Sequence, residues 1–204
     1  DSADLYQQAT ERASRIQAQS NLANIVASSV DLRETFDAFA EEVRWLIPFE
    51  QAAMLMIDQE TGIIERYASY PLNEVHSAGP MLLEGSVVQQ ILDAGEPVAL
   101  RRSTDGGAAE DWSVFGSEVS ELAAVAIRES SESTAVFALL HAGRADYDAM
   151  DLRALDEVSG LLSVTIDRQR LYERAEYVAR HDHLTGLANY RYLQEHLTKL
   201  QASA

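Results

Sequence analysis

The segment Leu83-Glu-Gly-Ser-Val-Val-Gln-Gln-Ile-Leu-Asp-Ala-Gly-Glu-Pro-Val98 has the pattern of a short helix followed by a strand. Gly85 and Ser86 give the helix a polar start, and Gly95 is a residue at which it can end. The apolar side chains between these boundaries are Val87, Val88, Ile91 and Leu92. The run Pro97-Val-Ala-Leu100 then predicts a short strand, so helix and strand alternate within one domain.

Towards the N-terminus, the sequence predicts an amphipathic helix and then a β-hairpin. Asp31-Leu-Arg-Glu34 resembles a capping box, and apolar residues follow at steps of four and three until Pro48 ends the helix. Residues 52–57 and 63–70 are expected as strands on either side of the turn Asp58-Gln-Glu-Thr-Gly62.

Towards the C-terminus, two loops, a second pair of strands and a long helix are expected. Residues 71–83 and 101–115 are irregular and polar enough to be loops. Residues 122–128 and 135–142 are expected as strands, and a helix is expected from near Ala149 to about Arg180.

Composition excludes several classes of function. Net charge is −17, from 33 acidic and 16 basic residues, so the surface would repel a phosphate backbone and we expect no nucleic-acid partner. There is no cysteine, which excludes disulfides and thiolate metal sites. Without a visible signal peptide or membrane-spanning run, we expect a cytoplasmic fragment with no membrane contact.

No catalytic or metal-binding motif is present in the chain. It has no P-loop, no glycine-rich dinucleotide fingerprint and no His-Glu-x-x-His. His76 and His141 are isolated, and His181 and His183 do not share a helix face, so no metal site is expected. We therefore expect this fragment not to be an enzyme and to hold no cofactor.

Near the C-terminus, Asp182-His-Leu-Thr-Gly-Leu-Ala-Asn189 resembles the opening segment of a GGDEF domain, the diguanylate cyclase fold. No GG-[DE]-E-F sequence follows, so we expect the chain to be the input half of a longer protein plus the truncated start of its output domain. The resemblance implies that Asp182, Leu184, Thr185, Gly186, Asn189 and Arg191 form the hinge to that domain. GTP and Mg are then expected only in the missing catalytic domain.

The order of the preceding elements, together with particular residues, is similar to a GAF domain. Leu83–Val98 resembles the family's middle helix-and-strand segment, and Tyr147-Asp-Ala-Met-Asp-Leu-Arg-Ala-Leu155 resembles its closing pattern. Leu171-Tyr172-Glu173 is similar to the usual exit into a signalling helix. The resemblance implies an α+β fold, a GAF/PAS-like antiparallel sheet flanked by helices, with long N- and C-terminal helices that form a parallel homodimer.

Four segments follow from these resemblances. They are residues 1–30 as an N-terminal helix, 31–160 as a GAF sensory domain, 161–180 as a signalling helix or coiled-coil linker, and 181–204 as the truncated start of a GGDEF domain.

An apolar seam is predicted on the last helix. Its positions alternate by three and four, as in a heptad repeat, and are Leu161, Val164, Arg168, Leu171, Ala175 and Val178. The N-terminal helix carries a thin apolar stripe of its own that includes Ile16. These residues can serve either a dimer interface or core packing, and we favour the dimer. The polar Arg168 would weaken the seam locally.

A small-molecule pocket is expected between the sheet and its loops. The residues expected near it are Tyr67, His76, Arg101, Trp112 and Phe115, because aromatic rings beside a few polar groups suit a small planar ligand. Alternatively, Trp112 and Phe115 only close the core. The Asn-Lys-x-x-Phe pattern of cyclic-nucleotide-binding GAF domains is not found.

The function expected from the sequence is a sensory and dimerisation module that regulates a C-terminal diguanylate cyclase. Two alternatives remain open at this stage. The chain could be a ligand-free structural dimeriser, or it could regulate a degenerate GGDEF domain that acts as a binding module.

Overall fold

The structure is a computed structural model that describes residues 17–18, 20–25, 27, 31–71, 81–102, 111–128, 133–181, 187 and 189. The chain divides into two compact units, Asp1–Thr165 and Ile166–Ala204. The fold class is α+β, as expected. Within the described residues, no helix combines the length and the apolarity that crossing a membrane requires.

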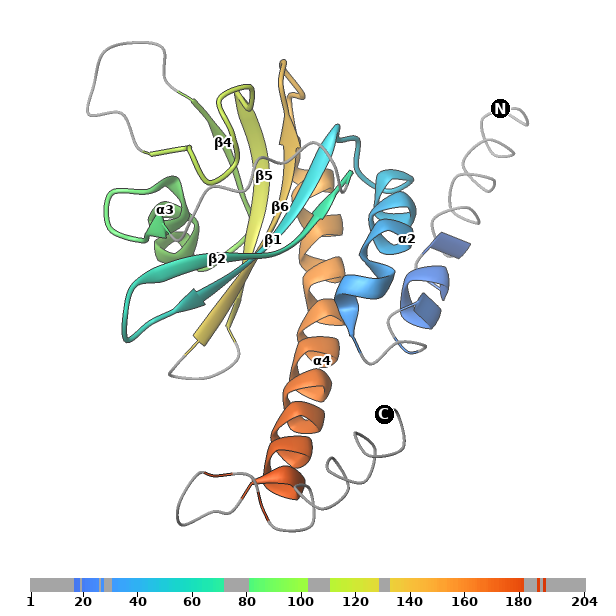
Figure 1. The fold of residues 1–204 in the computed structure, drawn as a ribbon. Coiled ribbons are helices and arrows are strands. Elements are labelled where there is room, and N and C mark those ends of the chain that lie inside the picture. The colour runs from blue at the N-terminus through green and yellow to red at the C-terminus, as the bar shows by residue number, and fades with distance from the viewer. Residues whose placement is uncertain are drawn as a thin grey trace, which may run out of the picture. The chain divides into compact units, whose positions relative to one another are not determined.

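The first unit contains a six-stranded antiparallel sheet (Figure 1). Its strands are β1 Gln51–Asp58, β2 Ile63–Tyr70, β3 Met81–Leu82, β4 Val98–Arg101, β5 Glu121–Arg128 and β6 Ser133–His141. The spatial order is β3-β2-β1-β6-β5-β4, so the first and last strands of the sequence are neighbours at the centre. β3 lies in a segment predicted as a loop, because two residues are too few to show an alternating pattern.

The helices begin and end at the residues that their local sequences favour. They are α2 Leu32–Arg44, α3 Val87–Ala94 and α4 Ala149–Arg180. Asp31 caps α2 by accepting a hydrogen bond of 2.9 Å from the Arg33 backbone N–H. Gly95 ends α3 with a φ of +70°, a left-handed conformation that glycine adopts without steric cost. Asp148 caps α4 by accepting from the Met150 N–H at 2.6 Å.

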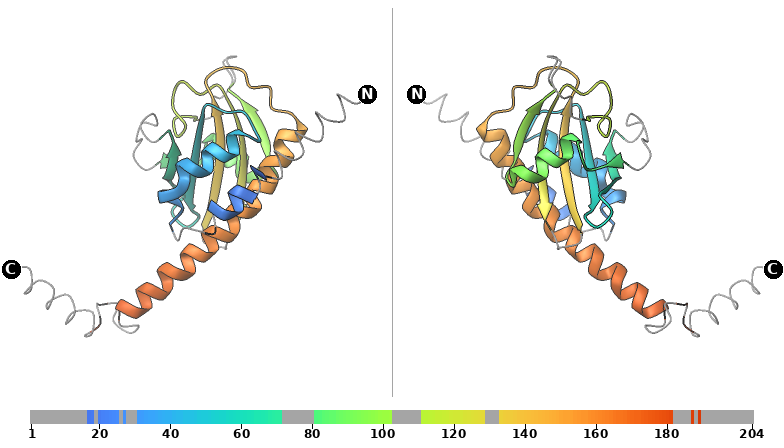
Figure 2. Two further views of the ribbon diagram at one scale, coloured as in Figure 1. Left: turned by 90° about the vertical axis from the view of Figure 1, so that its right-hand side faces the viewer. Right: turned by 90° about the vertical axis from the view of Figure 1, so that its left-hand side faces the viewer.

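The sheet is covered on both faces (Figures 1 and 2). α3 lies on one face, and α2 lies with the N-terminal half of α4 on the other. The core beneath α3 contains Leu55, Val87, Ile91 and Trp112. On the opposite face the ring of Phe137 lies edge-on to that of Phe39, with 5.7 Å between their centroids. Both sides of the sheet are therefore buried, which explains the nearly continuous apolar runs of β1, β5 and β6.

A β-bulge interrupts the pairing of β1 with β2. The register shifts between Met54 and Leu55, which lie opposite Ala68 and Arg66, so Tyr67 is the extra residue of β2. A bulge reverses the alternation of side chains along the strand that carries it. Arg66 shares the α3 face with its partner Leu55, and beyond the bulge Ser69 rather than Ala68 returns to that face. Tyr67 contacts the N-terminus of α2.

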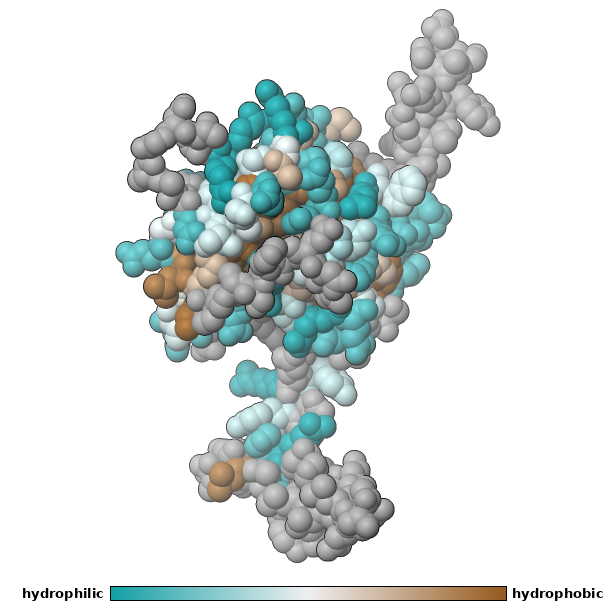
Figure 3. Space-filling model, turned by 45° about the horizontal axis from the view of Figure 1, so that its top comes forward, coloured by the Kyte–Doolittle hydropathy of each residue, from teal (hydrophilic) through white to brown (hydrophobic). Residues whose placement is uncertain are grey.

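The surface of the molecule is mainly polar on the face drawn in Figure 3, where hydrophobic side chains form small separate groups. Large hydrophobic side chains that are exposed include Trp45, Leu82, Met150, Val164, Leu171 and Val178. Three of these six, Val164, Leu171 and Val178, are positions of the predicted seam on α4.

Candidate ligand region and signalling helix

Trp112 and Phe115 are buried beneath α3, with 3% and 1% of their surfaces exposed. They belong to a turn that is tied to the start of α3, since the Val87 N–H donates to the Asp111 carbonyl at 3.1 Å. The Arg102 guanidinium lies over the Trp112 ring at 5.5 Å. The sequence left open whether these rings border a pocket or close the core. Here they are part of the core.

Tyr67 does not lie with Trp112 and Phe115. As the neighbour of Arg66 in β2, its side chain lies on the other side of the sheet, where its hydroxyl donates to Asp31 Oδ1 at 3.0 Å and Arg33 stacks on its ring at 4.7 Å. Burial disfavours the charged form of Asp31, but the hydrogen bonds from Arg33 N–H and from Tyr67 outweigh it, so the pKa of this carboxyl is lowered. Tyr67 thus connects β2 to Asp31, the N-cap residue of α2.

Arg101 is also separated from the two rings. It lies opposite Glu121 in the pairing of β4 with β5, and its Nη2 is 3.2 Å from Glu121 Oε2 and 3.3 Å from Asp146 Oδ1. Those carboxylates hold it at the end of the sheet, so the structure does not place Arg101 near Trp112. His76, the fifth residue predicted for the pocket, lies outside the described residues.

Arg66 is the residue of this region that the sequence interpretation missed. Its Nη2 donates to the Val114 carbonyl, which fixes the turn of Trp112 and Phe115 to β2. Burial lowers the pKa of its guanidinium. The available signal was position: Arg66 stands two residues after the apolar Ile64, so alternation places it on the buried face of β2.

A polar cluster closes the end of the sheet next to α4. Glu121, only 4% exposed, accepts from the Ala145 N–H at 3.0 Å, and Glu50 accepts from the Ala142 N–H at 2.8 Å. His141 Nδ1 lies 3.3 Å from Glu50 Oε1. Within the described residues, the buried hydroxyl of Tyr147 has no hydrogen-bond partner. Burial, together with the charges of Glu121, Asp151 and Glu50, raises the pKa of Tyr147.

Replacing Tyr147 by phenylalanine is expected to stabilise the chain at pH 7. The substitution removes a buried hydroxyl without a partner and leaves the ring in place, so we expect a gain of about 1 kcal/mol, or roughly 2–4 °C in Tm. Since the folded pKa is raised, the wild-type tyrosine also loses stability as pH rises above about 10, its unfolded value, and Y147F should lack this loss.

Urea unfolding of Y147F and wild type at pH 7 and pH 10.5 checks both effects. The exposed Tyr172 supplies the control variant Y172F, which should match wild type at each pH. A loss of more than about 1 kcal/mol for Y147F at pH 7 would mean that the hydroxyl has a stabilising partner.

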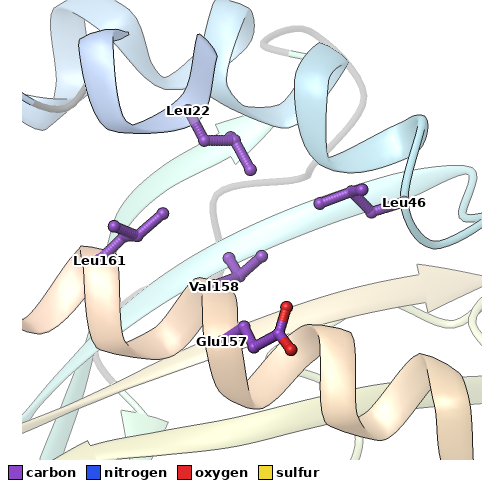
Figure 4. Close-up of a pocket in the computed structure, with 5 residues that line it drawn as sticks. All are labelled: Leu22, Leu46, Glu157, Val158 and Leu161. Atoms are coloured by element: carbon purple, nitrogen blue, oxygen red, sulfur yellow. The ribbon is translucent and has the colours of Figure 1, made fainter. Parts of the chain in front are cut away.

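An apolar cavity of about 170 Å³ lies on the side of the sheet that carries α2 and α4. Leu22 of the N-terminal segment, Leu46 after α2, and Val158 and Leu161 of α4 point towards it, with Glu157 at its edge (Figure 4). None of the residues predicted for the ligand pocket lines it. Leu161, the first position of the predicted seam, does.

The remaining positions of the seam are exposed on α4. The exposed fractions are 68% for Val164, 70% for Leu171 and 64% for Val178, and Arg168 and Ala175 are exposed as well. Ile16 lies outside the described residues. A row of exposed apolar side chains at heptad spacing is the surface that a partner helix would cover.

The last turn of α4 is capped by Asn189 within the second unit. Its side-chain amide donates to the Ala179 carbonyl at 2.7 Å, and its backbone N–H donates to the Arg180 carbonyl at 2.8 Å. Carbonyls of the last helical turn need donors from beyond the helix, and Asn189 supplies two of them. The other residues predicted for the hinge, Asp182, Leu184, Thr185, Gly186 and Arg191, lie outside the described residues.

A stacked pair of rings also lies at this end of α4. Tyr177 and His181 are 4.1 Å apart between centroids and 12° from parallel. The His181 N–H donates to the Tyr177 carbonyl at 2.8 Å, which extends the helical hydrogen bonding by one residue. Among the described residues, no group of three or more acidic or histidine side chains could hold a metal ion.

Comparisons with known proteins agree with this geometry. The sequence matches the GAF domain family over residues 29–167. The structure is similar to the GAF domain of a two-component sensor histidine kinase from Bacillus halodurans, at 18% identity and a TM-score of 0.59, over 71% of this chain and 99% of that one. No curated protein matches the chain.

Two further solved structures show the same fold. One is the GAF domain of a putative sensor histidine kinase from Pseudomonas syringae pv. tomato, at 16% identity and a TM-score of 0.58, over 86% of this chain and 99% of that one. The other is the free methionine-R-sulfoxide reductase from Neisseria meningitidis in complex with its substrate, at 13% identity and a TM-score of 0.63, over 80% of this chain and 93% of that one. Identities this low support a shared fold and no more.

Proposed function

Because this chain belongs to the GAF domain family, whose members are sensory and regulatory modules of signalling proteins, we propose that it is the sensory and dimerisation module of a diguanylate cyclase. In the parent protein it would regulate a C-terminal GGDEF domain that makes cyclic di-GMP from GTP. Two such domains must meet to react, so a regulator that controls the approach of two copies controls the reaction.

The observation that carries this proposal is the way in which the GAF domain continues into α4. Residues 29–167 match the family, α4 continues to Arg180, and the Asp182–Asn189 motif that resembles a GGDEF opening follows at once. Asn189, the last residue of that motif, caps the helix. A movement of α4 would thereby be transmitted directly to the start of the output domain.

Parallel dimerisation through the seam is part of the proposal. The exposed apolar residues Val164, Leu171 and Val178 recur at steps of seven, which keeps them on one side of a supercoiled helix. In a parallel pair each seam residue lies next to its own copy, so both helices reach their output domains in the same direction.

Single cysteines test this arrangement without background, because the chain has none of its own. In a parallel dimer L171C and V178C are each expected to form a disulfide-linked dimer under mild oxidation, because the bond needs Cβ atoms about 3.5–4.5 Å apart. R180C, on another face of the helix, is the control and should not cross-link. A monomeric mass by sedimentation and no cross-link at either seam position would exclude the dimer.

The regulatory role is tested in the parent protein. Cyclic di-GMP synthesis by the full-length enzyme should change when L171C is locked by oxidation and should recover on reduction, and R180C should show neither change. The 204-residue chain alone should make no cyclic di-GMP. Activity that is the same with and without residues 1–180 would overturn the proposal.

A second candidate is a structural dimeriser without a ligand. The burial of Trp112 and Phe115 favours it, because rings expected beside a ligand instead fill the core. This candidate predicts the same cross-links and no response to any small molecule, so ligand binding separates the two.

A further inference from the structure

Arg66 has a positive charge that no carboxylate neutralises within the described part of the chain. Its one hydrogen bond there goes to the Val114 carbonyl through Nη2, and its Nη1 is buried without a partner. Burial lowers the pKa of its guanidinium. In a sequence with 33 acidic and 16 basic residues, a half-buried cation without an acid beside it in the described part of the chain is unexpected.

Three other arginines, in α2, in β4 and in the loop after β6, show the contrast. Arg33 pairs with Asp31 at 3.3 Å, and Arg101 pairs with Glu121 at 3.2 Å. Arg144 pairs with Asp146. All three cations are more exposed than Arg66 and need a counter-ion less, yet each has one. Since arginine stays protonated in proteins, Arg66 cannot escape the cost of its burial by losing a proton.

The surroundings of Arg66 are mostly apolar with a few hydrogen-bonding groups. Leu55 and Ile64 share its face of the sheet, as does Ser69, which is 9% exposed. Arg66 donates to the start of the turn 112–117, and Arg102 donates to its end. The Arg102 guanidinium donates to the carbonyls of Ser117 at 2.7 Å and Gly116 at 3.4 Å. Arg66 and Arg102 thus both donate to carbonyls of this turn. The positive charge of Arg102, after the hydrogen bonds from Ser113, also helps to lower the pKa of Asp111.

We propose that Arg66 binds the carboxylate of a small organic acid between β2 and the turn 112–117. A guanidinium presents paired donors that match a carboxylate, and Nη1 is a donor that is not used. One unpaired cation neutralises one negative charge, so the apolar surroundings favour a monocarboxylate with an apolar body over a phosphate or a dicarboxylate. This inference rests on the proposed sensory role and names the class of ligand that the module would sense.

Thermal melting of the 204-residue chain with paired probes tests the inference. The probes are acetate, benzoate and indole-3-acetate, each with its neutral primary amide, and inorganic phosphate at matched ionic strength. At 100 times its Kd, a bound acid should raise Tm by about 5–10 °C, and its amide should not. R66M should abolish the shift, whereas R153M, which replaces an exposed arginine of α4, should retain it.

Two properties of the variants keep the test independent of misfolding. Without ligand, R66M should melt no more than a few degrees below wild type, because it removes an uncompensated charge together with one hydrogen bond. R66K retains the charge but loses the paired donors, so it should fold and bind the acid at least about tenfold more weakly.

The inference is overturned if no acid shifts Tm, if each amide matches its acid, or if R66M responds like wild type. A shift with phosphate or an amide alone would also overturn it, although the chain would then still have a ligand and the sensory role would stand. Failure of the sensory role would appear in a different measurement: the parent protein would have the same cyclase activity with and without residues 1–180.

Discussion

Replacing Phe137 by alanine is expected to lower the free energy of unfolding by about 3–5 kcal/mol. Phe137 is fully buried on β6 at the centre of the sheet, and its ring lies edge-on to Phe36 at 6.3 Å and to Phe39 at 5.7 Å. The substitution removes these contacts and leaves a cavity that α2 and the sheet cannot close completely. For a domain with roughly 5–15 kcal/mol of stability, this is a large share.

Urea unfolding measures this loss of stability, and two further variants provide an intermediate case and a control. F137L keeps much of the apolar volume and should cost roughly half as much as F137A. W45A removes an aromatic ring that is 83% exposed and should lie within about 0.5 kcal/mol of wild type. If F137A cost no more than W45A, Phe137 would not connect α2 to the sheet as described.

The second large effect is expected at Glu121, where alanine should cost about 2–3 kcal/mol. The side chain is almost fully buried, accepts the Ala145 N–H at 3.0 Å and pairs with Arg101. Alanine would leave a backbone donor without an acceptor and would release the segment that leads into α4. E121Q retains an oxygen at the same place and should recover about half of the loss.

Hydrogen exchange of the Ala145 amide gives the local readout, with urea unfolding for the whole domain. Exchange should be faster in E121A and close to wild type in E118A, which removes an exposed glutamate three residues earlier. Equal stability of E121A and E118A would show that the buried carboxylate is dispensable.

Most of the secondary structure could be predicted because its signals are local. The strand expected at 63–70 and the helix expected from Ala149 to about Arg180 are found at those residues. Asp31, Gly95 and Asp148 mark the ends of helices through their own backbone preferences and hydrogen bonds. The α+β class follows from the order of these elements.

The arrangement of side chains around the sheet could not be predicted, because it depends on pairing between distant strands. The bulge opposite Met54 and Leu55 brings Ser69 rather than Ala68 to the face of Arg66, and an alternating pattern does not reveal a bulge. Arg101 lies near Glu121 because β4 pairs with β5 in one particular register. Whether the predicted pocket residues bind a ligand remains a prediction.

The position of β1 has a consequence for the synthesis of the protein. β1 is made before β6 but lies next to it in the sheet, with Asp58 opposite Ser133. At about 5–20 residues per second, the ribosome needs roughly 4–15 s to produce the chain between them. During that interval the nascent hairpin of β1 and β2 has an unpaired, apolar edge, the kind that chaperones recognise and that aggregation exploits. Pairing with β6 therefore covers this edge and ends the exposure of the nascent hairpin.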